Sequence, residues 1–129
     1  GWGRIVAITS IAAKQPIDNL ILSNTARAGV LGFVKSLSQQ VAADGITVNT
    51  VCPGYHLTER LASLASLTAK QENVTVEEIY ARWAATTPMK RIGDPKEFAG
   101  VVAFLCSEQA SYVTGTVIQI DGGAYRGLI

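Results

Sequence analysis

Three short runs of β-branched and apolar residues limit the folds open to this chain more than any other feature. They occupy residues 4–9 (RIVAIT), 46–51 (ITVNTV) and 116–120 (TVIQI). Each run is short, almost wholly apolar and bounded by loop-forming residues, as is typical of a buried strand in a parallel sheet. Because helical patterns separate the runs, we predict an α/β fold with three parallel strands.

A helical period connects the first two runs, from about residue 20 to residue 43. Its apolar stripe consists of Val30, Val34, Leu37 and Val41. We place Ser38 off this stripe. Gly45 follows at the position expected for a helix cap, so the helix should end just before it.

Capping patterns predict the helices that follow the second strand. Thr75 and Glu78 form a capping box within a polar, mostly helical segment at about 58–86. Asp94, Pro95 and Glu97 place a cap, a proline and a glutamate at the start of a further helix. We expect that helix to run to about residue 108.

Composition restricts the class of protein. The 129 residues are 48% hydrophobic and 16% charged, which suits one globular domain with a real core. The net charge is +1, and the lysines and arginines are scattered singly along the chain, so we expect no nucleic-acid partner. No apolar run is long enough for a membrane span, and no leader-type sequence opens the chain. Cys52 and Cys106 lack metal-type spacing, so we predict buried, reduced thiols, no metal site and a cytoplasmic location.

Three longer segments then resemble the C-terminal half of the classical short-chain dehydrogenase/reductases, closest in style to 3-oxoacyl-acyl-carrier-protein reductases. GRIVAITS resembles the fifth strand of that family and its active-site serine. GVLGFVKSLSQQVAADGITVNTVCPG resembles the next helix, the sixth strand and a Pro-Gly turn. TPMKRIGDPKEFAGVVAFLCSEQASYVTGTVIQIDGG resembles the closing helix and the seventh strand.

The resemblance implies a doubly wound, Rossmann-like parallel sheet of which this chain supplies strands five to seven. Residues 1–129 would form the C-terminal part of a single domain, with a helical lid at about 58–87. The glycine-rich turn and the Asn-Ala-Gly segment of the family's dinucleotide-binding half are absent from the sequence. We therefore expect a fragment of a longer protein, whose first strand has an unpaired apolar edge. A naturally short remnant that needs a partner is the alternative.

The resemblance also assigns three catalytic positions. Ser10 matches the family's active-site serine, which hydrogen-bonds the substrate oxygen. Ser23 and Arg27 occupy the positions of a Tyr and a Lys, four residues apart on one helical face. In the family the Tyr supplies a proton, while the Lys lowers the pKa of that Tyr and binds the nicotinamide ribose. Arg27 keeps the charge, but the serine hydroxyl is a much weaker acid than a phenol and its side chain is shorter.

A second group of positions matches the family's cofactor site. Pro53 and Gly54 form the turn over the nicotinamide, and Thr58 follows four residues later. The resemblance assigns these residues, the backbone near His56 and Arg27 to NADP or NAD. For His56, the only histidine, a backbone role is favoured over a catalytic one. Lys14 and Asp18 are conceivable replacements for the missing acid, although solvated loop charges explain both.

Two functions from different classes follow. One is an NAD(P)-dependent reductase of a small carbonyl substrate resembling a 3-oxoacyl thioester, with Ser23 and Arg27 as an atypical pair. The other is a non-catalytic homologue that binds nucleotide or assembles with an active relative; a plain interaction domain has little support. The family resemblance further implies a homo-oligomer, either a tetramer or a dimer.

Overall fold

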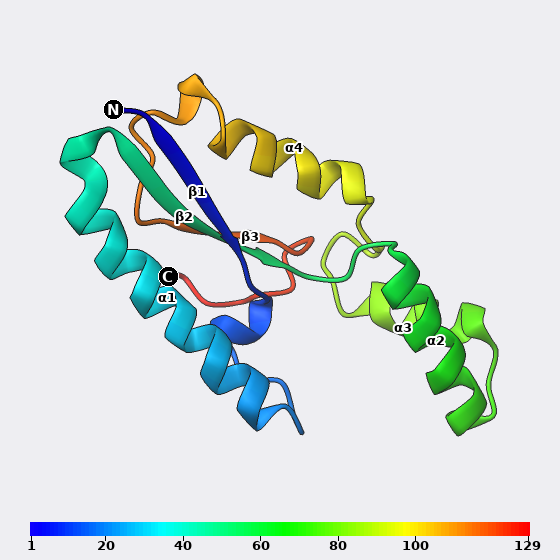
Figure 1. Ribbon diagram of the computed structural model, residues 1–129. Helices are drawn as coiled ribbons and strands as arrows, with labels where there is room; N and C mark the ends of the chain where they lie inside the picture. Colours follow the sequence, from blue (N-terminus) through cyan, green and yellow to red (C-terminus); the bar gives the residue numbers. More distant parts are fainter.

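A computed structural model describes all residues from 1 to 129. It has the predicted α/β class, with parallel strands alternating with helices (Figure 1). The strands and α-helices in chain order are β1 (Gly3–Ile8), α1 (Ile21–Val41), β2 (Ile46–Pro53), α2 (Glu59–Glu72), α3 (Val76–Ala85), α4 (Pro95–Leu105) and β3 (Val117–Ile120). The strand predictions are confirmed to within two residues at either end.

The sheet has the order β1-β2-β3, and both pairings are parallel. Gly3 pairs with Ile46 and Ile8 with Val51, so the two longer strands end near one another. Figure 1 shows α1 and α4 on opposite sides of this sheet. The result is a three-layer arrangement in which the carboxyl ends of the strands meet at one edge, where ligands bind in open α/β sheets.

The core is centred on β2, as expected for the middle strand. Val48, Val51 and Cys52 have no exposed surface. The strand continues through Pro53, beyond the predicted end, because the Gly54 amide donates to the Ile120 carbonyl and extends the pairing with β3.

Two side-chain placements differ from the prediction. Ser38 is fully buried, because it lies four residues from Val34 on the face of α1 that covers the sheet. Its hydroxyl lies so close to Gly115 that a Cβ at that position would come within 2.6 Å of it. Cys52 is a buried free thiol as predicted, but Cys106 is exposed because it caps the end of α4.

The predicted lid segment forms a helical hairpin of α2 and α3, which projects to one side of the sheet (Figure 1). Thr58 caps α2, and Thr75 and Glu78 form the predicted capping box of α3. Ala65, Ala69 and Ile79 make a small core between the two helices. The hairpin therefore has packing of its own, separate from that of the sheet.

Strand β1 lies at the edge of the sheet and pairs only with β2. The side chains of Ile5 and Ile8 are 45% and 59% exposed.

No helix of the chain has the length and apolar character required to cross a membrane.

Candidate active site

A cavity of about 430 Å³ opens where β1 and β2 end, bordered by residues from α1, α2 and α4. Six of the seven residues predicted for the site line it: Ser10, Arg27, Pro53, Gly54, His56 and Thr58. The seventh, Ser23, does not belong to the lining. Residues that are separated by up to 48 positions in sequence therefore share one cavity, although their roles remain predictions.

Arg27 connects α1 to the end of β1. Its Nη1 donates to the Thr9 carbonyl at 2.7 Å, and its Nε donates to Ser23 Oγ at 3.2 Å. Ser23 and Arg27 thus contact one another across one helical turn, as their spacing predicted. Of the two, it is the guanidinium that reaches the cavity.

Two hydroxyls, those of Ser10 and Thr58, border the cavity. Ser10 begins a 3₁₀ turn over Ile11–Ala13, and its Oγ accepts from the Ala12 amide at 3.1 Å. Thr58 caps α2, and its Oγ1 accepts from the Leu61 amide at 3.2 Å. Since each oxygen accepts a backbone hydrogen bond, each keeps its own O–H to donate to a ligand.

The Pro53–Gly54 turn is held against the segment that follows β3. A Cβ at Gly54 would lie 2.8 Å from the Cα of Asp121, so only glycine allows this approach. The Asp121 carboxylate in turn accepts from the amides of Gly123 and Tyr125. The floor of the cavity is therefore fixed by backbone packing.

The His56 side chain is half-buried and packs against neighbouring residues. Its ring makes an edge contact with Phe98, with centroids 5.5 Å apart, and its Nδ1 lies 3.2 Å from the Gly54 carbonyl oxygen. The ring also covers Gly93, whose missing side chain gives it room. This packing suits a positioning role for the segment.

Tyr55 is the only tyrosine in the lining of the cavity. Its ring stacks on Trp83 of α3 at a centroid distance of 5.1 Å. Burial raises the pKa of the Tyr55 hydroxyl above its usual value. A phenol whose proton is held more tightly is a poorer general acid near neutral pH, so Tyr55 is not an obvious substitute for the family tyrosine.

Lys14 and Asp18 lie outside the cavity lining. The Lys14 ammonium sits 4.6 Å from the centre of the Tyr125 ring, a cation–π contact with the C-terminal segment. Asp18 is an exposed loop residue. The interpretation of both as loop charges agrees with these positions.

Six further lining residues were not predicted for the site: Ile8, Thr9, Tyr55, Arg60, Pro95 and Phe98. Leu61 and Leu64, which the sequence offers as apolar surface for a substrate or for a neighbouring subunit, line the cavity as well. For α2 a signal was present, because Arg60, Leu61 and Leu64 recur at helical spacing after the Thr58 cap. For Pro95 and Phe98 no local signal existed, since their approach depends on how α4 packs.

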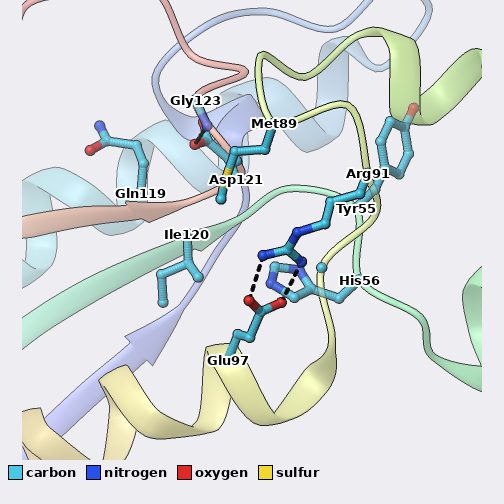
Figure 2. Close-up of a pocket in the computed structure, with 11 residues that line it drawn as sticks. Tyr55, His56, Met89, Arg91, Glu97, Gln119, Ile120, Asp121 and Gly123 are labelled. Atoms are coloured by element: carbon cyan, nitrogen blue, oxygen red, sulfur yellow. Dashed lines mark hydrogen bonds and ion pairs between the residues drawn. The ribbon is translucent and has the colours of Figure 1, made fainter.

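A second cavity, of about 290 Å³, lies next to the first and shares Tyr55 and His56 with it. Figure 2 shows the Arg91 guanidinium directed at the Glu97 carboxylate, with His56 beside the pair. The two groups form a bidentate ion pair at 2.6 and 2.7 Å. The hydrogen bond from Arg91, helped by one from the Asp94 amide, lowers the pKa of Glu97 to about 2.

Comparison with known proteins places this geometry in a family. The family described as enoyl-(acyl carrier protein) reductase matches residues 1–125. The chain belongs to the short-chain dehydrogenase/reductase family. It is 40% identical over 124 residues to the 3-oxoacyl-acyl-carrier-protein reductase FabG of Aquifex aeolicus, covering 96% of this chain and 46% of that protein. It is 36% identical over 127 residues to the acetoacetyl-CoA reductase of Cupriavidus necator, covering 98% of this chain and 47% of that protein.

Among solved short-chain dehydrogenase/reductase structures, L-sorbose reductase from Gluconobacter frateurii complexed with NADPH and L-sorbose superposes with a TM-score of 0.91. The sequence identity is 33%, and the match covers 98% of this chain and 49% of that one. The fold is therefore a Rossmann-like short-chain dehydrogenase/reductase fold, and this chain spans about half the length of the relatives it matches.

Proposed function

We propose that this chain is the C-terminal half of an NADP- or NAD-dependent oxidoreductase that reduces a small carbonyl compound, with a 3-oxoacyl thioester as the first substrate class to test. The observation that supports this most is the gathering of Ser10, Arg27 and Thr58 around one cavity at the carboxyl ends of two parallel strands. Relatives at 34–40% identity include 3-oxoacyl-acyl-carrier-protein, acetoacetyl-CoA and NADPH-dependent reductases.

The donor set of the cavity fits a nicotinamide cofactor. Hydroxyls of Ser10 and Thr58 and the guanidinium of Arg27 are hydrogen-bond donors, and no carboxylate lines the cavity. Such a lining favours ribose hydroxyls, a carboxamide oxygen and phosphate over a metal ion. In this proposal Arg27 and Thr58 hold the nicotinamide half of the cofactor, while the adenosine half is bound by a preceding dinucleotide-binding half.

The residues of this chain then act on the substrate oxygen. When bound, the reduced cofactor supplies a hydride to the carbonyl carbon. The Ser10 hydroxyl donates a hydrogen bond to the carbonyl oxygen, and Arg27 stabilises the negative charge that develops there. Because Ser23 does not line the cavity, the proposal takes the proton for that oxygen from a solvent water, which leaves as hydroxide. Without a positioned acid, turnover is expected to be about 10²–10⁴-fold slower than with one.

A non-catalytic role is the second candidate, and one observation favours it. Ser23 Oγ accepts from Arg27 rather than facing the cavity, so the pair is engaged within α1. In that case the domain binds nucleotide or assembles with an active relative. Exposed Ile21, Leu22 and Phe33 on α1 give an apolar surface for the homo-oligomer expected under either proposal.

The deciding experiment uses the full-length protein, meaning this chain joined to the preceding half of the fold. NADPH oxidation is followed with a 3-oxoacyl thioester for the wild type and for the double variant Ser23→Tyr/Arg27→Lys. Measurable wild-type turnover that rises about 10²-fold or more in the variant supports the reductase with a missing acid. A wild type that binds NADPH but never turns over, beside an active variant, supports the non-catalytic role. A wild type that binds no NADPH excludes both.

A further inference from the structure

Arg60, near the start of α2, lines the same cavity as Ser10 and Arg27. It takes part in none of the chain's ion pairs, which join Arg4 to Glu108, Arg82 to Glu72 and Arg91 to Glu97. It also donates no hydrogen bond to any other residue, unlike Arg27. Arg60 therefore presents all its donors without a partner in the chain.

The charges around this cavity are all of one sign. Arg27 and Arg60 line it together, and neither Asp nor Glu does, although the chain has ten acidic residues. Glu59 precedes Arg60 but lies on a different side of the helix and forms no ion pair with it. The first turn of α2 adds the positive end of a 14-residue helix. The electrostatics of the cavity therefore favour an anion.

Part of the lining of this cavity is apolar. Leu61 and Leu64 come from the same helix, and Phe98 and Ile8 come from α4 and β1. A guanidinium at the edge of an apolar wall binds a carboxylate or a phosphate through two parallel hydrogen bonds. The lining thus matches a molecule with a short apolar body and an anionic end.

We propose that Arg60 recognises an oxyanion on the substrate, so that the enzyme prefers ketones that carry a carboxylate. This inference rests on the proposed reductase function. Arg27 is occupied by Thr9 and Ser23 near the reacting carbonyl, whereas Arg60 stands on the lid hairpin with free donors. The carbonyl is held at Ser10, and the anionic end is held at Arg60. A phosphate of the cofactor has the same chemistry, and the experiment separates the two sources.

The test uses full-length wild type and the variants Arg60→Gln and Arg60→Lys. Lys70→Gln serves as the matched control, because Lys70 is an exposed cation on the same helix outside this cavity. NADPH oxidation is measured with 5-oxohexanoate and with its uncharged amide. We expect Arg60→Gln to raise the KM for the acid about 10-fold or more, with the KM for the amide and the Kd for NADPH within twofold. The KM of Arg60→Lys for the acid should lie between those of wild type and Arg60→Gln, and the KM of Lys70→Gln should match that of wild type.

Three outcomes would overturn the assignment. Equal changes in KM for the acid and the amide would show that Arg60 does not recognise the substrate carboxylate. A weaker affinity for NADPH with unchanged preference for the acid would show that Arg60 binds an oxyanion of the cofactor. If neither ketone is reduced, binding is measured instead, as the shift in Tm that each ketone causes in wild type and in Arg60→Gln with NADP⁺ present. Stabilisation by the acid in wild type but not in Arg60→Gln keeps the site while the reductase proposal fails. No difference between the two proteins removes the site.

Discussion

The two neighbouring cavities differ in how their arginines are used. Around the larger one, Arg27 donates to uncharged oxygens, Arg60 has no partner, and no carboxylate is present. Around the smaller one, Arg91 is paired with Glu97 through two short hydrogen bonds (Figure 2). A paired arginine supports structure, while an arginine without a counter-ion is available to a ligand. The contrast supports the proposal that the larger cavity binds the ligand, while the Arg91–Glu97 pair beside the smaller one has a structural role.

The largest expected effect on activity comes from replacing Arg27, and it is compared with the same replacement at Arg91. In the full-length protein, Arg27→Met should lower kcat/KM for carbonyl reduction about 10²-fold, because charge-assisted hydrogen bonds to the cofactor and the reacting oxygen are lost. Arg91→Met should change kcat/KM by less than about threefold, since its charge is already satisfied by Glu97. Steady-state kinetics of both variants checks this, with Arg27→Lys as the charge-preserving control. Similar losses in both variants would break the contrast between the cavities.

The smallest expected effect concerns stability at the paired site. The pKa of Glu97 lies at about 2 in the folded chain, below its ordinary value of 4.5. A lowered carboxyl pKa contributes stability above pH 4.5, and that contribution disappears as the pH falls through about 2. Glu97→Gln keeps an acceptor for the Asp94 amide but loses the charge.

We therefore expect Glu97→Gln to have a slightly lower Tm than wild type at pH 7, because exposed ion pairs contribute little. The difference should shrink between pH 4.5 and pH 2. Thermal unfolding followed by circular dichroism across this range measures it. A Tm difference that stays constant with pH would show that Glu97 does not stabilise the fold through its ion pair with Arg91.

Much of the fold could be predicted because its signals are local. β-branched runs gave the three strands, and the capping boxes at Thr75 and Asp94 gave the starts of α3 and α4. Six residues that the family resemblance assigned to a site line one cavity. All of them except Arg27, which lies on α1, come at or shortly after the ends of β1 and β2. In a parallel sheet those positions meet at one edge whatever the side chains are.

The predictions fail mainly where the burial or position of a side chain depends on packing between elements far apart in the sequence. The sequence pattern predicts Ser38 off the apolar stripe of α1, but Ser38 is buried because the Gly115 loop approaches that face closely. Cys106 was expected to be buried, but it lies one residue past the end of α4. The place of Arg60 in the cavity depends on how the α2–α3 hairpin packs, which no local pattern records.

The central claim, that the cavity without carboxylates carries hydride transfer to a carbonyl, is tested most directly with NADPH deuterated at C4. Full-length wild type, Arg91→Met and Arg27→Met are each incubated with cofactor that carries deuterium at both C4 positions and with a ketone, and the product is analysed by mass spectrometry. The claim predicts an alcohol with deuterium on the former carbonyl carbon from wild type and Arg91→Met, and about 10²-fold less of it from Arg27→Met. No labelled alcohol from wild type, or equal amounts from wild type and Arg27→Met, would contradict it.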